Sequence, residues 1–270
     1  MPTVPSVVLS SPTRRTVGGP GRPLVVIGQR INPTGRPGLG RDLARGDLEG
    51  VGWEAGDQVA AGAAALDVNG WLPGTDEADL LCRLVAAVGA ATDAPLVLDS
   101  ADPDVLLTAL EACPGRPLIN AVNALSWRRA AGDRLLAATA ERGSAVVLSP
   151  LDERGPSPDP ADRLAVARRL LDRAADHGLG PDQVLVDPLV EPVATTPGGG
   201  RRALETLRRL SGELGVATVA GIGNAGYGSP HRAVVEADFL ARAVTAGLTA
   251  AIVDPALLVA SRPGGAGHPS

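Results

Sequence analysis

Short apolar runs alternate with helical patterns along most of the chain. Eight runs have the length of a strand buried on both faces, and they lie at residues 24–27, 65–68, 96–98, 117–119, 145–148, 184–186, 217–220 and 250–253. Strand–helix alternation implies parallel pairing with right-handed crossovers. Eight such units predict an α/β fold, a closed (β/α)₈ TIM barrel. A doubly wound open sheet is the rival, because periodicity alone does not separate the two.

The start signals of the helices and the composition of the two ends define one domain. Asp159 followed by Pro160, for example, combines an N-cap with a first-turn proline. We expect the barrel to cover residues 21–262. The Gly-, Pro- and Ser-rich stretches at residues 1–20 and 263–270 predict a flexible leader and a flexible tail.

Polar side chains follow each of the eight apolar runs. In chain order they are Gln29, Arg30 and Asn32; Asp67 and Asn69; Asp99 and Ser100; Asn120 and Asn123; Asp152; Asp187; Asn224; and Asp254. In a barrel these positions all lie at the C-terminal rim, where barrel enzymes keep their active sites. A single Asp or Asn after a strand is as compatible with a turn or a helix cap. Their recurrence at each strand end predicts a polar active-site mouth.

Composition narrows the partners that this chain can bind. Hydrophobic residues make up 44 % and aromatic residues only 2 %, so the core is built from aliphatic side chains. The net charge is −5, and every one of the 25 basic residues is an arginine. A mildly acidic chain does not favour nucleic acid or an anionic membrane surface. No apolar run reaches the ~18 residues of a spanning helix and no secretory signal opens the chain. Cys82 and Cys113 are expected to be reduced thiols of a cytoplasmic protein.

The candidate residues also exclude several common kinds of site. No Cys/His cluster has the spacing of metal ligands, so no metal is expected. Residues 198–200 are a glycine run without the lysine of a P-loop. The mouth is instead made of carboxylates and carboxamides, which suit a neutral, flat ligand with several N–H donors and ring acceptors. A pterin ring has such an edge.

Eight motifs in this order carry a family resemblance. They are IGQRINPTG at residues 27–35, AGA at 61–63 with LDVN at 66–69, LDS at 98–100, GRPLIN at 115–120, VDPLV at 186–190 with PVAT at 192–195, and GIGN at 221–224. With them, the chain resembles the methyltetrahydrofolate:corrinoid methyltransferases. The fold of that family also forms the pterin-binding domain of cobalamin-dependent methionine synthase, and it is more distantly related to dihydropteroate synthase.

The resemblance implies roles for the residues that match. Asp99, Asn120 and Asp187 fall where the family hydrogen-bonds the pterin ring, and Asp67 and Asn69 match a polar pair of the same mouth. The catalytic residue it implies is Asn224, which falls where the family places an asparagine against N5 of the folate. Further contacts at the rim are expected from Gln29, Arg30, Asn32, Ser100, Asp152 and Arg232.

The chain also departs from the family at the rim. Gln29 stands where the family usually has Glu, Gly223 where it has Ser, and His231 and Glu236 where it often has Asn. Leu125 stands where a Glu is frequent. The pterin floor is therefore expected to be retained, whereas the rim that meets the second substrate has changed.

The activity that the resemblance implies is methyl transfer between N5-methyltetrahydrofolate and a corrinoid. The chain has no cobalamin module, so we expect the corrinoid (cobalamin) to arrive in trans, on a separate protein or free. Family members pair through their barrel helices, which implies a homodimer.

Three alternatives stay open at this point. A dihydropteroate synthase relies on a lysine near the pterin, which a lysine-free chain does not supply. A specialised folate-dependent transferase acting on a small metabolite agrees with the altered rim. A non-catalytic folate-binding protein would keep the floor without turnover, and the presence of Asn224 argues against it.

Overall fold

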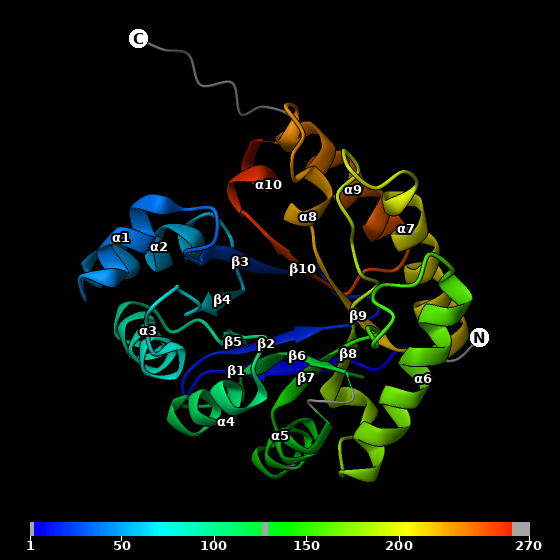
Figure 1. Ribbon diagram of the computed structural model, residues 1–270, viewed down its shortest axis with the longest axis horizontal. Coiled ribbons are helices and arrows are strands. Elements are labelled where there is room, and N and C mark those ends of the chain that lie inside the picture. The colour runs from blue at the N-terminus through cyan, green and yellow to red at the C-terminus, as the bar shows by residue number, and fades with distance from the viewer. Residues whose placement is uncertain (1–2, 126–128, 261–270) are drawn as a thin grey trace.

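Eight parallel strands close into a barrel in the computed structural model, which describes residues 3–125 and 129–260 (Figure 1). The strands are β3 (Val25–Ile31), β4 (Ala65–Asn69), β5 (Leu96–Asp99), β6 (Leu118–Asn123), β7 (Ala145–Ser149), β8 (Val184–Val186), β9 (Ala217–Gly221) and β10 (Ala250–Val253). The sheet closes because β10 pairs in parallel with both β9 and β3. The predicted TIM barrel is therefore confirmed, and the open sheet is excluded.

Helices surround the barrel and connect its strands, as Figure 1 shows. They are α1 (Pro37–Ala44), α2 (Glu49–Ala60), α3 (Glu77–Ala91), α4 (Pro103–Ala112), α5 (Arg129–Arg142), α6 (Pro160–Asp176), α7 (Gly199–Arg209), α8 (Gly223–Gly226), α9 (Arg232–Thr245) and α10 (Ala256–Ala260). A 3₁₀ turn precedes β8 at Pro181–Gln183, and a π-helical turn follows α7 at Leu210–Leu214. The N-cap expected at Asp159 is present, because its carboxylate accepts a hydrogen bond from the backbone N–H of Ala161.

A buried apolar cluster with a member from every barrel strand lies below the polar strand ends. Its members from the barrel strands are Val25, Ile27, Ala65, Val97, Leu118, Ala145, Val147, Leu185, Ala217, Val219 and Ala250. Most are small or β-branched, which suits the narrow interior of an eight-stranded barrel. This cluster gives the polar residues above it a rigid, water-excluding support.

A two-stranded hairpin packs against that cluster, in a part of the chain where a flexible leader was expected. Strand β1 (Val7–Ser10) pairs antiparallel with β2 (Arg15–Gly18), and Val7 and Leu9 are buried in the cluster. The Thr16 hydroxyl donates to the carbonyl of Ala64, just before β4. Two apolar residues in alternation are too short a signal to stand out among serines, prolines and glycines, so the pairing escapes a reading of the sequence. The predicted tail at residues 263–270 lies outside the described residues.

Two further observations concern the membrane and the thiols. In the described part of the chain, no helix is long and apolar enough to cross a membrane. Both cysteines are free, and Cys113 is buried.

Candidate active site

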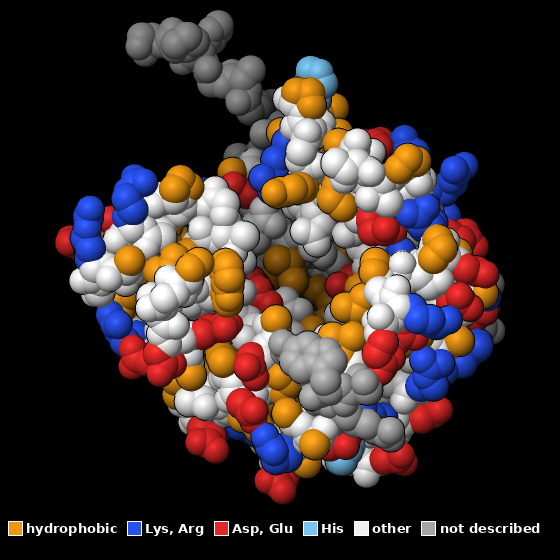
Figure 2. Space-filling view, in the orientation of Figure 1, with side chains coloured by type: hydrophobic (Ala, Val, Ile, Leu, Met, Phe, Trp, Pro, Cys, Tyr) orange, Lys and Arg blue, Asp and Glu red, His pale blue; other side chains and the backbone are white. Residues whose placement is uncertain are grey.

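A cavity of about 960 Å³ opens at the C-terminal ends of the barrel strands. Figure 2 looks into it as the hollow at the centre of the molecule. Nine of the twelve predicted site residues line it: Gln29, Arg30, Asn32, Asp67, Asp99, Asn120, Asp187, Asn224 and Arg232. The strand ends thus bring together side chains that are up to two hundred residues apart in the sequence.

We call the polar lining residues Asp67, Asp99, Asn120 and Asp187 the floor of the cavity. Three consecutive strands supply its first half. Asn69 of β4, Asp99 of β5 and Asn120 of β6 are register partners in the sheet. The Asn69 Nδ2 donates to Asp99 Oδ2 at 2.9 Å, and the Asn120 Nδ2 lies 3.5 Å from Asp67 Oδ1. A carboxamide therefore orients each of the two carboxylates: Asn69 reaches Asp99 from the adjacent strand, and Asn120 reaches Asp67 from the strand beyond β5.

Burial changes the acidity of these two carboxyl groups. Burial, together with the nearby charge of Asp99, raises the pKa of Asp67 well above its usual range, although the Asn120 hydrogen bond opposes this. Burial raises the pKa of Asp99 to about 6, against the hydrogen bond from Asn69 and with the charge of Glu77. A carboxylate accepts hydrogen bonds and a carboxylic acid also donates one. This half of the floor can therefore present both donors and acceptors near neutral pH.

Asp187 follows β8, which stands four strands from β4 in the eight-stranded barrel and so faces the first half of the floor. Burial raises the pKa of Asp187 to about 6. Two contacts oppose the rise: the backbone N–H of Leu189, which donates to Asp187 Oδ1 at 2.8 Å, and the positive charge of Arg163. A flat ligand between β4 and β8 would have acidic groups on both sides.

Asn224 lies in the short helix α8, directly after β9. A Cβ atom on Gly221 would come within 3.1 Å of the Asn224 Nδ2, so the glycine leaves room for the carboxamide over the end of β9. Within residues 3–125 and 129–260, this carboxamide has no hydrogen-bond partner although it lines the cavity. It is therefore available to a ligand.

The Gln29 side chain occupies the space that a side chain at position 223 would need. A Cβ atom on Gly223 would lie 2.9 Å from Gln29 Oε1 and 3.1 Å from an Arg232 guanidinium nitrogen. A serine at position 223 would therefore displace both side chains. The two departures from the family pattern at positions 29 and 223 fit each other sterically.

Arginines at the rim are paired with carboxylates. Arg30 and Arg36 both contact Glu54 of α2, with shortest N–O distances of 2.9 and 2.8 Å. Arg232 contacts Glu236 on the next turn of α9 at 2.5 Å. These pairs leave the rim near charge balance, while the floor below it is acidic.

The other three predicted site residues lie outside the cavity lining. Asn69 stands behind Asp99, as described above. Ser100 is buried and donates to Glu77 Oε1 at 2.6 Å, so it braces the start of α3. Asp152 is held by the Arg154 guanidinium at 2.9 Å. Ser100 and Asp152 both follow strands, but their side chains contact neighbouring segments and do not line the cavity.

Several lining residues were not among the predicted site residues. They are Thr34, Gly35, Arg36, Val147, Val219, Gly221, Gly223, Tyr227, Ala233, Glu236, Ile252 and Asp254. Asp254 carried a usable signal, because it ends the eighth apolar run. Arg36 directly precedes α1 and Glu236 lies within α9, where nothing in the pattern indicates the mouth. Among the described residues no group of three or more His, Cys, Asp and Glu side chains is arranged to hold a metal ion.

Sequence comparisons show which known proteins this chain is similar to. Residues 29–254 match the model of the family described as pterin binding enzyme. The chain is 30 % identical over 243 residues to a methionine synthase of Mycobacterium tuberculosis (strain ATCC 25618 / H37Rv), which covers 85 % of this chain and 20 % of that protein. It is 23 % identical over 237 residues to a methylcorrinoid:tetrahydrofolate methyltransferase of Eubacterium limosum, with 86 % and 85 % covered. The chain thus spans about a fifth of the length of the methionine synthases it matches.

Solved structures show the same fold at lower sequence identity. The 7,8-dihydropteroate synthase of Vibrio fischeri ES114 superposes with a TM-score of 0.69 at 19 % identity, covering 93 % of this chain and 94 % of that one. A Xanthomonas albilineans dihydropteroate synthase with 4-aminobenzoic acid gives 0.67 at 24 % identity, covering 96 % and 100 %. At such identities the likeness establishes the fold alone. The family match over most of the chain goes further, and this protein belongs to the pterin-binding enzymes.

Proposed function

We propose that this enzyme moves a methyl group between N5-methyltetrahydrofolate and a corrinoid carried by a separate protein. The observation that carries the proposal is the unpartnered Asn224 carboxamide at the cavity wall, above a floor of buried carboxylates. The similarity to a methylcorrinoid:tetrahydrofolate methyltransferase along most of both chains supports the same chemistry.

The floor would bind the pterin ring. The ring's amino and N–H edge offers parallel donors, and a carboxylate offers two parallel acceptors to such an edge. We assign this edge to Asp187, and the remaining ring heteroatoms to Asp67, Asp99 and Asn120, which can donate as well as accept. Asn69 would act behind them, by orienting Asp99.

Asn224 would act on the reacting nitrogen. Breaking the bond between N5 and its methyl group leaves electron density on a nitrogen that is a poor leaving group. A carboxamide does not supply a proton at neutral pH, but its N–H donates a hydrogen bond that strengthens as charge develops. The proton itself would come from water. The carboxamide thus stabilises the transition state more than the bound substrate.

The mouth suits an incoming second substrate. Trp71 after β4, Val193 after β8 and Tyr227 after α8 are exposed apolar or aromatic side chains, and Tyr227 lines the cavity. When bound, a corrinoid supplies a cobalt centre that exchanges methyl groups with N5. Gln29, Arg30 and Arg232 would be the rim residues that meet it, because they lie on the open side of the cavity.

A second candidate keeps the folate chemistry and changes the acceptor. The Gln29 side chain fills the space beside Gly223, so the rim differs in shape at two positions where the family usually has other residues. This observation favours a specialised transferase whose acceptor is a small metabolite. It leaves the floor and Asn224 in the same roles.

An anaerobic transfer assay tests the proposal. The enzyme is mixed with methyltetrahydrofolate and reduced cobalamin, and the cobalt absorbance is followed; the reverse reaction starts from methylcobalamin and tetrahydrofolate. Asn123→Ala is the control, because Asn123 also ends a strand and, among the described residues, its side chain bonds only the nearby backbone N–H of Leu125. We expect transfer in at least one direction, slowed by about 10²–10³-fold in Asn224→Ala and kept in Asn123→Ala. Folate binding without transfer to cobalamin or to a corrinoid protein would favour the small-metabolite acceptor.

Three further properties belong to the same proposal. Folate would bind without a metal, which calorimetry with and without a chelator tests. The enzyme would be a cytoplasmic homodimer, and light scattering at micromolar concentration should give twice the mass of the chain. A monomer mass, or folate binding that a chelator abolishes, would contradict the respective point.

A further inference from the structure

A fully buried arginine contacts the backbone that directly follows Asp187. Arg163, in the first turn of α6, has a side-chain exposure of 0 %. Its Nη1 donates to the carbonyl oxygens of Pro188 and Leu189, each at 2.8 Å, and its Nε donates to the Ser157 carbonyl at 2.7 Å. Its Nη2 pairs with Glu191 Oε2 at 2.6 Å. A buried charge is retained only where such contacts replace its hydration.

Those contacts hold a backbone that is unfavourable by itself. Leu189 has φ of +62°, in the left-handed region that side chains other than glycine rarely adopt. In this conformation the Leu189 N–H turns back and donates to Asp187 Oδ1 at 2.8 Å. The carbonyl groups before and after that N–H are the two that Arg163 binds. The guanidinium therefore stabilises the turn that fixes the Asp187 carboxylate.

We propose that Arg163 is a positioning residue, which aims the Asp187 carboxylate at the edge of the pterin ring through the left-handed turn at Leu189. The identity of the ligand rests on the proposed function. The stabilisation of the Leu189 turn by Arg163 does not depend on it. Arg163 is absent from the cavity lining, so it would act only through Asp187.

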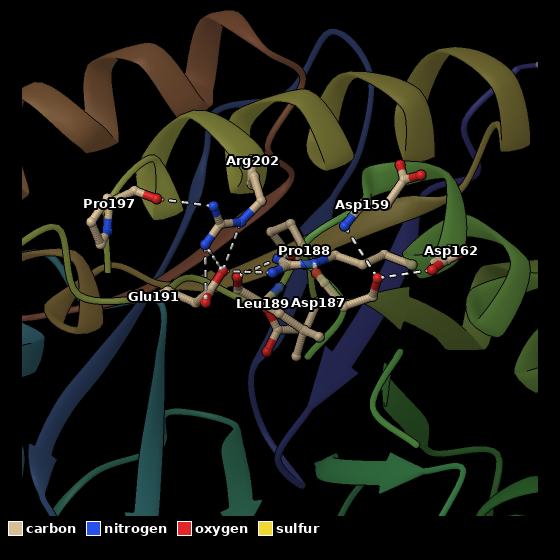
Figure 3. A network of polar contacts seen from close by, with 10 residues as sticks. Asp159, Asp162, Asp187, Pro188, Leu189, Glu191, Pro197 and Arg202 are labelled. Carbon is tan, nitrogen blue, oxygen red and sulfur yellow. Dashed lines mark hydrogen bonds and ion pairs between the residues drawn. The ribbon is translucent and has the colours of Figure 1, made fainter. Parts of the chain in front are cut away.

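Arg202 of α7 provides a matched control. It also contacts Glu191, at 3.3 Å, and it donates to the Pro197 carbonyl, but it binds neither Pro188 nor Leu189 (Figure 3). Removing either arginine leaves Glu191 with the other as a partner. A difference between the two variants therefore reports on the turn and not on the charge of Glu191.

The first experiment measures amide hydrogen exchange in the ligand-free enzyme. We expect Arg163→Met to accelerate exchange at Leu189 by tenfold or more, with little change in the rest of the barrel, and Arg202→Met to leave Leu189 within about threefold of the parent. Equal acceleration throughout the barrel would show a merely structural role and would overturn the proposal.

The second experiment separates binding from rate. Because Asp187 would hold the ring equally in the bound state and in the transition state, Arg163→Met should weaken tetrahydrofolate binding about tenfold. The saturating single-turnover rate should stay within about threefold of the parent enzyme. Arg202→Met should change neither. If Arg163→Met does not fold, Arg163→Lys decides, because an ammonium can pair with Glu191 but does not span the same set of carbonyls.

A second substitution gives a rescue. Glycine adopts the left-handed conformation without a penalty, so Leu189→Gly in the Arg163→Met background should restore most of the affinity. Unchanged affinity and unchanged Leu189 exchange in both Arg163 variants would overturn the proposal. If the parent enzyme binds no folate or pterin, the proposed function fails, while faster exchange at Leu189 would still establish that Arg163 orders the Asp187 turn.

Discussion

The floor and the rim of the cavity are built in opposite ways. On the floor, buried carboxylates stand beside carboxamides and a backbone N–H, and Asp67 is only 3 % exposed. At the rim, arginines pair with carboxylates while remaining open to water, as with Arg30, whose side chain is 37 % exposed. Buried polar groups bind with high specificity, because a ligand that leaves them without a hydrogen bond loses binding free energy equal to their desolvation cost. Exposed ion pairs contribute little by themselves.

Under the proposed function, this difference would assign the two substrates to two levels of one cavity. A floor fixed by hydrogen bonds suits a ligand whose shape and hydrogen-bonding edge do not vary, such as a pterin. A rim of exchangeable, solvated contacts suits a partner that differs from one family member to another. The departures from the family at Gln29 and Gly223 lie at the rim, where such a change has least effect on the floor.

The largest effect is expected where the two levels meet. Replacing Asn224 by Ala should slow single-turnover methyl transfer by about 10²–10³-fold, because it removes a hydrogen-bond donor from developing charge. Folate affinity should change far less. Rapid-mixing absorbance of the cobalt centre and calorimetry measure the two quantities on protein whose melting temperature has been checked. A folded variant with undiminished transfer would contradict the role of Asn224.

A floor substitution should weaken binding and not the chemical step. Asp187→Ala leaves ring donors unpaired, which typically costs about 1–3 kcal/mol and predicts a ten- to hundredfold loss of folate affinity. Asp152→Ala is the matched comparison, since Asp152 also follows a strand but is held by Arg154 outside the cavity. Equal losses in both variants would mean that the Asp187 effect is indirect.

Lowering the pH should have opposite effects on two properties of the floor: the stability of the ligand-free protein and its affinity for folate. The pKa of Asp187 is raised from 3.8 to about 6 in the folded protein. Between these values the folded state binds more protons than the unfolded chain, so this group lowers the stability of the ligand-free protein as the pH rises through that window. Folate binding needs the ionised form, so affinity should fall about tenfold per pH unit below 6.

The comparison for this pH effect is Asp187→Asn, which does not titrate. Affinity measured from pH 8 to pH 5 should lose its dependence on Asp187 in that variant, while the effects of the other carboxyl groups remain. Parallel pH profiles for the two proteins would contradict the assignment.

A rim substitution should have the smallest effect on folate. Arg30→Ala leaves Glu54 paired with Arg36 and removes only a long contact of 3.9 Å to Asp254, whose carboxylate still accepts a hydrogen bond from the backbone N–H of Ala256. Folate affinity should change by less than about threefold, as expected for an exposed pair, and the KM for the methyl acceptor should change more. Titration of each substrate separately measures the two effects. The reverse order would mean that the rim, and not the floor, holds the folate.

Features that depend on one continuous segment of the sequence were predicted well, and contacts between separate segments were not. The eight apolar runs coincide with the eight barrel strands, since a strand buried on both faces is apolar throughout. Strand-end position brought Asp67, Asp99, Asn120 and Asp187 to one cavity, because a parallel barrel gathers all its C-terminal strand ends at one mouth. The same rule failed for Ser100 and Asp152, whose contacts depend on side chains from neighbouring segments.

Contacts between distant segments left no readable signal. Glu54 meets Arg30 and Arg36 from α2, and Arg163 reaches the Asp187 turn from α6. In the sequence, Arg163 is one of several arginines in an amphipathic helix, where an exposed position is the ordinary expectation. The folded chain instead places its guanidinium against the Pro188 and Leu189 carbonyls, a contact that the helical pattern does not indicate.

The most direct test is the structure of the enzyme with bound methyltetrahydrofolate. The expected result is a pterin ring between β4 and β8, with its N–H edge on Asp187 and the Asn224 carboxamide nitrogen about 3 Å from N5. Density for the ring outside the strand ends, or with N5 directed away from Asn224, would contradict it.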